Sequence, residues 1–174
     1  MRRTIHFTTA ETAHGPVAIA ASEKGVCWLS FDTNPSTFRE RFPRARIVHG
    51  GELATGLERA VASAIDNPSD KHRIPLDLHG TDFQCSVWDM LLTIPAGETR
   101  SYADLARALG KPNATRAVGA ANGQNPVAVL VPCHRVIASD GTLGGYAGGL
   151  PLKQALLAGE GARFVRELEQ PLLF

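Results

Sequence analysis

The sequence has few cysteines, and their spacing does not match a disulfide framework or a structural metal site. Its three cysteines, Cys27, Cys85 and Cys133, are far apart, and no CxxC pair occurs among its 174 residues. An odd, scattered set argues against a disulfide framework and against a cysteine-rich zinc site. We therefore expect a reducing, intracellular setting and a protein that needs no metal or other cofactor.

Long apolar runs are also absent. No stretch approaches the roughly 18 residues that a membrane-spanning helix needs. The N-terminus, MRRTIHFTTAETAHG, contains arginines but lacks the apolar core of a signal peptide. These absences predict a soluble, cytoplasmic protein without a membrane partner.

No excess of one charge is present either. Residues 1–80 hold 10 basic and 9 acidic side chains, residues 81–174 hold 8 and 8, and the formal net charge is +1. Many nucleic-acid binders are strongly basic, so a DNA-binding hypothesis must rest on local features here. We interpret the one basic cluster, Arg39, Arg41, Arg44 and Arg46, as a solvated face.

Residues 1–80 are typical of a small α/β unit. Their short β-rich runs and intervening turn residues predict a meander, and a helical apolar stripe follows it. His79-Gly80 is the expected domain boundary. We expect strands at 4–9, 17–21, 26–31, 46–49 and 73–78, and helices at 35–42 and 52–65, the second with Leu53, Leu57, Ala60, Val61 and Ala64 on its inner face.

Residues 81–174 have the pattern of a mostly helical second unit. Thr81 and Gln84 have the spacing of a capping box at the start of one helix, and Ser101 and Asp104 repeat it at the next. That helix ends at Gly110, and another follows over 114–122. Two short helices joined by a glycine-containing turn form a helix-turn-helix pattern, although most helical hairpins bind no DNA. The predicted fold class is thus mixed α/β (α+β).

The helix at 114–122 has almost no side-chain bulk. Arg116 is its only long charged residue, and Ala117, Gly119, Ala120 and Ala121 make up most of the rest. Recognition helices in the major groove normally carry several long polar side chains. A smooth helix suits close approach to a groove without reading the sequence, but tight packing against a neighbouring helix is the alternative.

The stretch VLVPCHRVI, residues 129–137, contains the chemistry. Cys133 lies between a proline and a histidine in an apolar run, which we expect to be a strand. It could be a small core residue, or a nucleophile whose proton His134 removes, across a tight turn or through a water. An imidazole base needs a carboxylate to orient it, and Asp140, Glu160 and Glu98 are the candidates that spacing leaves open.

Together, these motifs resemble the O6-alkylguanine-DNA alkyltransferases, also called methylated-DNA–protein-cysteine methyltransferases. The resemblance runs from Phe83 to about Gly161, with Asn125 eight residues before Cys133. Residues 1–80 match only in general character, as the small ribonuclease-H-like domain that precedes the active-site domain in this family. The matching motifs are RAVGAAN (116–122), NP (125–126), PCHRV (132–136), GYAGG (145–149) and Glu160-Gly161.

The resemblance implies a single-turnover DNA repair protein. Cys133 would take the alkyl group from O6 of a flipped-out guanine, and O4-alkylthymine stays open as a second substrate. His134 would remove the thiol proton through a water, Glu160 would hold His134, Asn125 would brace the active-site turn, and Tyr102 would assist flipping and donate to guanine N3. The expected partner is the minor groove of double-stranded DNA, bound by a monomer. The implied DNA contacts are Arg116, Ala117, Ala120, Ala121, Asn122, Tyr102 and Arg135, and the implied base pocket is Val136, Tyr146, Ala147 and Gly148.

Each role has a structural alternative. Tyr102 could pack on its helix stripe, Asn125 could only form an Asx turn before Pro126, and Glu160 could be a solvated charge at a helix end. Two sequence departures stand out: many members have Ser where this chain has Ala147, and often a His where it has Gly159. Two other functions compete, a lesion-binding protein without chemistry and a cysteine hydrolase.

Overall fold

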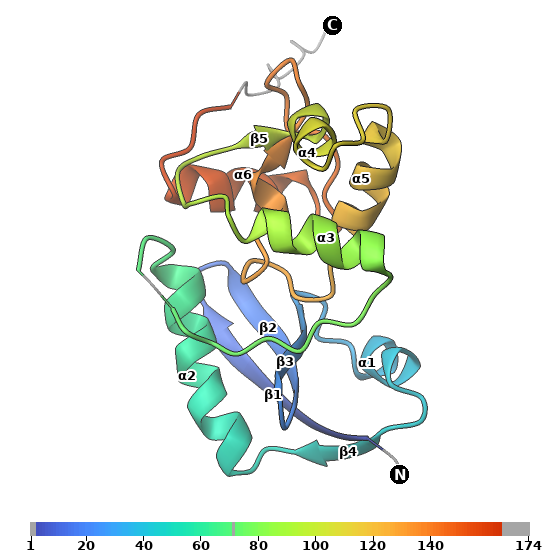
Figure 1. Cartoon of the computed structure of the whole chain (residues 1–174). Helices are drawn as coiled ribbons and strands as arrows, with labels where there is room; N and C mark the ends of the chain where they lie inside the picture. Colours follow the sequence, from blue (N-terminus) through green and yellow to red (C-terminus); the bar gives the residue numbers. More distant parts are fainter. Residues whose placement is uncertain (1–2, 71, 165–174) are drawn as a thin grey trace, which may run out of the picture.

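The computed structural model describes residues 3–70 and 72–164. Figure 1 shows a sheet with helices beside it in one half of the molecule and a group of helices in the other. In chain order the elements are β1 (Thr4–Thr12), β2 (Gly15–Ser22), β3 (Gly25–Ser30), α1 (Pro35–Arg41), β4 (Arg46–His49), α2 (Glu52–Asp66), α3 (Asp82–Leu91), β5 (Arg100–Ser101), α4 (Tyr102–Ala108), α5 (Thr115–Gly123), a 3₁₀ turn (Cys133–Arg135), β6 (Val136–Ile137) and α6 (Leu150–Gly159).

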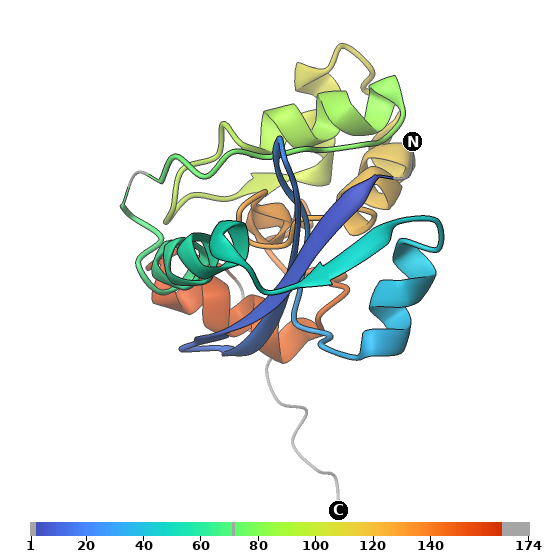
Figure 2. The same cartoon turned by 90° about the horizontal axis from the view of Figure 1, so that it is seen from below.

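The main sheet has the order β3-β2-β1-β4. β1, β2 and β3 form an antiparallel meander, while β4 runs parallel to β1 because α1 separates it from β3. β2 is buried along nearly its whole length, as expected for a strand covered on both faces. Successive side chains alternate between the faces. Ala18 and Ala20 thus meet Phe38 of α1, while Val17 and Ile19 join the cluster that contains Val61 of α2, and Figure 2 shows these helices on opposite sides of the sheet.

Most predicted elements of the first half are confirmed, but two details are wrong. Leu53 is 40% exposed, and Ala54, one position further, is buried instead, so the inner face of α2 is rotated from the predicted one. The strand predicted at 73–78 is only a single bridge between Leu76 and Val26. Val26 N donates to Pro75 O at 2.8 Å and Asp77 N donates to Val26 O at 2.9 Å, and Pro75 has no N–H with which to extend the ladder.

The second half starts its helices as the sequence predicts. Thr81 and Gln84 form a complete capping box at α3, and Ser101 and Asp104 form another at α4. α4 and α5 pack together as a helix-turn-helix around Gly110, whose φ of +70° lies in the left-handed region. No helix within the described ranges has the length and apolar character needed to cross a membrane.

A shared core connects the two halves. Val17, Leu29 and Val61 from the first half belong to the same buried cluster as Trp88 and Val131 from the second. The division at residue 80 and the ribonuclease-H-like character of residues 1–80 stay predictions, and the end of the predicted 81–174 unit lies outside the described residues. The common core nevertheless means that the sheet supports the segment that carries Cys133.

Candidate active site and DNA-binding face

The segment before Cys133 is a folded-back loop rather than the predicted strand. Val131 N donates to Val127 O at 3.0 Å, which turns the chain back on itself, and Val129 has a φ of 67°. A positive φ is strained for a β-branched residue, and such strain persists only where the surroundings enforce it. The apolar residues are buried, as their sequence suggests, but in a turn rather than along a sheet.

Asn125 fixes this loop from inside. Its Nδ2 donates to Val131 O at 2.7 Å, and its Oδ1 accepts from Val127 N at 3.0 Å. The second bond is the Asx turn that the sequence left as the alternative, and the first is the predicted brace, so Asn125 makes both. The backbone of Leu29 in β3 pairs with Pro126 and Ala128 on the outer side of the loop, at 3.0 and 3.1 Å.

Cys133, His134 and Arg135 form a short 3₁₀ turn directly after Pro132. A strand would direct neighbouring side chains to opposite faces, whereas this turn changes their relative direction. The His134 side chain is fully buried, and its Nε2 lies 2.8 Å from Glu160 Oε1. The structure thus brings Glu160 to His134, while Asp140 bonds Thr142 and Glu98 pairs with Arg100.

The ionisation of Glu160 determines which His134 nitrogen can act as a base. Burial alone would raise the pKa of Glu160, but bonds and charges from His134 and Arg135 lower it to about 2. An ionised carboxylate only accepts hydrogen bonds, so neutral His134 must carry its proton on Nε2. Burial also lowers the pKa of His134, which keeps the ring neutral. The buried Nδ1 has no partner among the described residues and is therefore free to accept a proton.

Arg135 belongs to this cluster rather than to a DNA-binding surface. Its Nε and Nη2 donate to Glu160 at 2.7–3.2 Å, and its Nη1 donates to Ile94 O at 2.6 Å. The residue is only 9% exposed. We therefore correct its assignment as a DNA contact, because a guanidinium engaged in this way cannot reach a phosphate. Glu160, whose side chain is 2% exposed, is likewise no solvated helix-end charge.

The Cys133 thiol is protonated at rest. Burial raises its pKa, while a hydrogen bond from Asn125, the charge of Lys153 and nearby backbone N–H groups act in the opposite direction. A thiol with a raised pKa is a poor nucleophile, so reaction requires removal of its proton. The groups near Cys133 thus favour the thiolate once it forms, and the free Nδ1 of His134 is the acceptor for the thiol proton.

Lys153 is the functional candidate that the sequence reasoning missed. It is fully buried in α6, and its Nζ donates to the carbonyls of Val136, Leu143 and Gly145 at 2.6, 2.5 and 3.1 Å. Burial lowers its pKa to about 8. A signal was available, because Leu156 and Leu157 follow at helical spacing, which puts the lysine on an apolar face.

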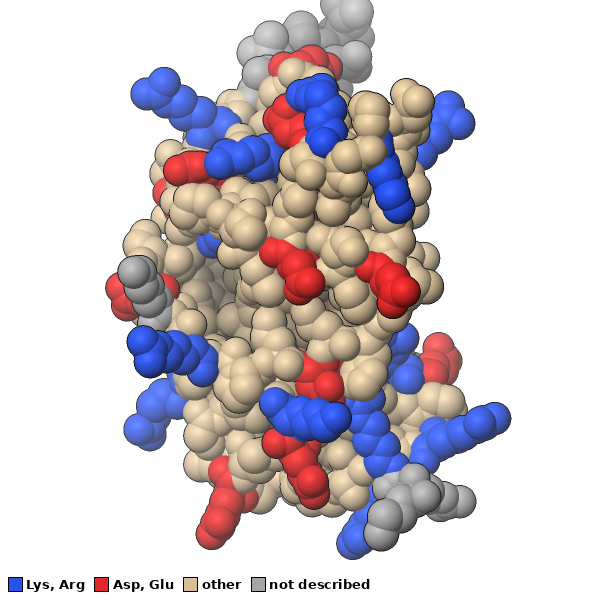
Figure 3. All heavy atoms as spheres, viewed as in Figure 1, with Lys and Arg blue, Asp and Glu red and all other residues tan. Residues whose placement is uncertain are grey.

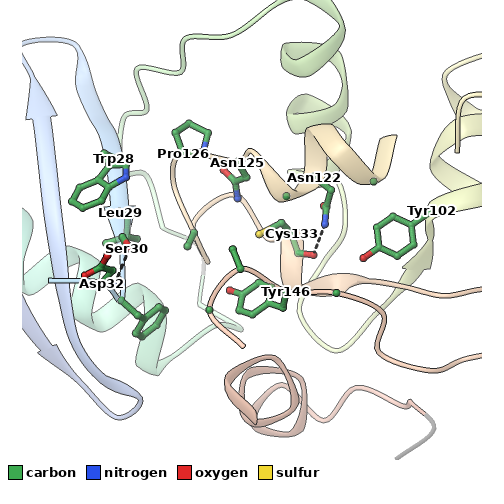
Figure 4. Close-up of a pocket in the computed structure, with 17 residues that line it drawn as sticks. Trp28, Leu29, Ser30, Asp32, Tyr102, Asn122, Asn125, Pro126, Cys133 and Tyr146 are labelled. Atoms are coloured by element: carbon green, nitrogen blue, oxygen red, sulfur yellow. Dashed lines mark hydrogen bonds between the residues drawn. The ribbon is translucent and has the colours of Figure 1, made fainter. Parts of the chain in front are cut away.

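A cavity of about 560 Å³ opens in front of Cys133. This volume lies within the roughly 300–1,000 Å³ range of small-molecule pockets, so it can admit a nucleobase. Figure 4 shows the sulfur pointing toward Asn125, with Tyr102 on one side and the segment from Trp28 to Asp32 on the other. The N-terminal half thus forms one wall of the cavity, which sequence reasoning did not predict.

Three of the four residues predicted to form the base pocket line this cavity, and their role in binding a base stays a prediction. Tyr146, Ala147 and Gly148 line the cavity. Val136 does not line it, because the side chain is fully buried and the carbonyl accepts from Lys153. The Tyr146 hydroxyl is buried without a partner among the described residues, and burial raises its pKa, so it stays a hydrogen-bond donor.

Tyr102 lines the same cavity while it also packs against the glycine-rich loop. Its ring lies so near Gly144 that a Cβ there would come within 3.2 Å, and Gly144 has a φ of +69°. Burial raises the pKa of Tyr102, and the hydroxyl therefore stays protonated. The structure thus shows the packing that the sequence left as the alternative, and the role of Tyr102 at the base stays a prediction.

The free face of α5 is smooth and carries one charge. Arg116, Ala117 and Ala120 are exposed. Ala121 and Asn122, which the resemblance placed among the DNA contacts, are buried at 2% and 4% exposure, so we correct those two assignments. Asn122 instead donates from Nδ2 to Cys133 O at 3.3 Å. One helix therefore both presents a smooth surface and supports the cysteine.

Comparison with known proteins is decisive at this point. A methylated-DNA–protein-cysteine methyltransferase of Methanosarcina barkeri is 40% identical over 153 residues, which cover 88% of this chain and 95% of the relative. Residues 82–162 match the family model described as the DNA-binding domain of 6-O-methylguanine DNA methyltransferase. The chain belongs to the 6-O-methylguanine DNA methyltransferase family.

Solved structures agree with this membership. A Mycobacterium tuberculosis OGT structure in complex with DNA has a TM-score of 0.78 and 40% identity, and covers 90% of this chain and 92% of that one. The Escherichia coli protein named bifunctional transcriptional activator/DNA repair enzyme Ada is 38% identical over 160 residues, which are 90% of this chain but 45% of Ada. This methyltransferase family member therefore has the mixed α/β fold that the sequence predicts. Among the described residues, no cluster of His, Cys, Asp and Glu is arranged to hold a metal ion.

Proposed function

We propose that this protein repairs DNA by transferring a methyl or larger alkyl group from O6 of guanine to Sγ of Cys133. The observation that carries the proposal is the placement of Cys133 in a cavity of nucleobase size with the His134–Glu160 pair behind it. Family membership, argued from a relative matched along nearly its whole length, supports the same reaction.

The transfer is an in-line displacement. His134 Nδ1 removes the thiol proton through one water, and the thiolate attacks the alkyl carbon. The S–C bond forms as the C–O bond breaks, and the released guanine takes a proton at N3 from the Tyr102 hydroxyl, which is reprotonated by the proton that His134 took from the thiol. Glu160 stabilises the imidazolium that forms meanwhile. The balance is therefore one alkyl group gained by sulfur and one proton passed to the base.

DNA binds on the smooth face of α5. Arg116 enters the minor groove and fills the space that the extruded base leaves, with Ala117 and Ala120 allowing close approach. Extrusion costs a few kcal/mol, less where an alkylated guanine already pairs poorly. The protein acts as a monomer on double-stranded DNA, in the cytoplasm, and with the nucleoid if its source is bacterial.

The product ends the protein's activity. An alkyl thioether has no carbonyl for water to attack, so each molecule reacts once. This consequence distinguishes the proposal from a cysteine hydrolase, which turns over. A lesion-binding protein without chemistry would need the cavity and α5, but not a thiol with a proton acceptor beside it.

Intact-protein mass spectrometry tests the proposal. After mixing with duplex DNA that contains O6-methylguanine, the protein should gain the mass of one CH₂ group, and peptide mapping should place it on Cys133. Cys133→Ala should acquire nothing and still bind the lesion, while Cys27→Ala and Cys85→Ala should react like the wild type. An unchanged mass, a modification at Cys27 or Cys85, or repeated turnover would each refute the proposal.

A further inference from the structure

A second concavity lies beside the Cys133 cavity, in the crease between the two halves of the molecule. Its volume is about 370 Å³, and Arg41 from the end of α1 and His79 line it from one side. Gln84 of α3 and Gln124 after α5 line it from the other. The two cavities share four lining residues, Trp28, Gly123, Asn125 and Pro126.

Hydrogen-bond donors converge on this crease. Arg41 is exposed and has no ion pair or side-chain hydrogen bond within residues 3–70 and 72–164. Gln84 Nε2 donates to Gln124 Oε1 at 2.7 Å, which leaves the Gln124 NH₂ group free to donate. His79 Nε2 lies 2.8 Å from Asp77 Oδ1, and the lining of the crease among the described residues includes no aspartate or glutamate.

The charge of the surrounding segment has the sign that an anion needs. Residues 32–49 contain four arginines against Asp32 and Glu40, a net +2 in a chain whose total is +1. Figures 1 and 2 both place α1 and α5 at the same lateral edge of the molecule. Figure 3 shows positive side chains gathered over the region of α1 and β4, whereas the signs are mixed elsewhere on that face.

We propose that this crease binds a backbone phosphate of the DNA strand whose damaged base occupies the Cys133 cavity, with Arg41 as its main ligand. The inference rests on the proposed repair function and extends the DNA-binding surface from α5 to the N-terminal half. A guanidinium presents donors in a planar fork that matches phosphate oxygens. The shared wall at Gly123–Pro126 puts this site beside the nucleotide that is extruded.

Other occupants fit the crease less well. Its donors and charge do not favour an apolar peptide segment, and its continuity with the Cys133 cavity favours a ligand that reaches both. DNA is such a ligand, because its phosphates follow the modified nucleotide along one covalent strand. An acidic protein or a second copy of this chain would instead contact the arginine cluster without entering the Cys133 cavity.

Salt dependence of DNA binding tests the proposal. We would compare Arg41→Gln with the matched control Arg59→Gln, which removes the same charge from an exposed position on α2. Both would be made in the Cys133→Ala protein so that the lesion survives, and fluorescence anisotropy would be measured from about 50 to 200 mM salt. Arg41→Gln should make the plot of log affinity against log salt shallower by about 0.9, the value for one phosphate contact on duplex DNA, and Arg59→Gln should not.

Two further measurements separate the outcomes. Free O6-benzylguanine has no phosphate, so its reaction with Arg41→Gln that retains Cys133 measures the active site alone. If Arg41→Gln slows this reaction as much as it weakens DNA binding, Arg41 supports the fold, and the proposal is overturned. Equal slopes of log affinity against log salt for the two variants would also overturn it. The same holds if Arg41→Gln changes only the self-association of the protein, measured by sedimentation. If wild-type protein takes no alkyl group from lesion DNA, the proposed function itself fails.

Discussion

Replacing Glu160 with glutamine should weaken both the fold and the reaction, because one carboxylate serves two buried partners. Glu160 accepts from His134 Nε2 and from two nitrogens of Arg135. A glutamine keeps one oxygen and turns an NH₂ group toward these donors. His134 and Arg135 would then compete for the oxygen, and one would face another donor.

The pKa of Glu160 gives the size of the effect. Its fall from 4.5 to about 2 corresponds to roughly 3 kcal/mol, at about 1.4 kcal/mol per pKa unit. Since the folded pKa lies below the ordinary value, this stability is fully present above pH 4.5 and is lost as the pH falls toward 2. Glu160→Gln should therefore lower the free energy of unfolding by about 3 kcal/mol at neutral pH, within the range for breaking a buried ion pair.

Urea unfolding across the acidic range measures this. The difference in unfolding free energy between wild type and Glu160→Gln should shrink as the pH falls below 4.5. Asp140→Asn and Glu98→Gln, at the two exposed carboxylates that the sequence left as rivals, are the matched controls and should differ little from wild type. A deficit that does not depend on pH, or no deficit at all, would refute the assignment.

Single-turnover alkyl transfer provides the second readout. Without the carboxylate, the imidazolium is less stable, so transfer near neutral pH should slow and its pH profile should move upward. The loss in rate should be at least tenfold and no larger than the ~10²–10⁴ that a positioned general base contributes. If both residues act in one relay, adding His134→Gln should cost little more, whereas fully multiplicative losses would separate them.

Arg116→Ala should slow repair of duplex DNA much more than reaction with free O6-benzylguanine, since its exposed charge on α5 serves extrusion; equal losses in single-turnover rates would contradict this. Lys153→Met should raise the apparent pKa of Cys133, measured by the pH dependence of iodoacetamide alkylation, because a positive charge that favours the thiolate is lost. Lys153→Arg keeps the positive charge and should leave the apparent pKa of Cys133 much nearer the wild-type value, and a pKa equal to that of Lys153→Met would show that charge is not the cause.

The sequence by itself determined what local chemistry can encode. Thr81 and Ser101 begin their helices because a side-chain oxygen and a residue three positions on complete a capping box, and both are within one turn of chain. Alternating and helical apolar patterns likewise predicted the meander and α2. The motif around Cys133 identified the family, because the spacing of its residues was specific enough without any structure.

Only the tertiary structure decided which distant groups meet. Spacing could not choose among three carboxylates for His134, and the contact with Glu160 arises because α6 packs against the 3₁₀ turn. Arg135 was predicted to contact DNA and Lys153 was given no role, yet each is buried because its hydrogen bonds go to groups far away in the chain. The strand predicted before Cys133 was wrong partly for the same reason, since the distant Leu29 bonds the backbone of that segment while Asn125, six residues from Val131, holds the turn from within. Burial and non-local hydrogen bonding depend on the whole fold, and local sequence therefore cannot fix them.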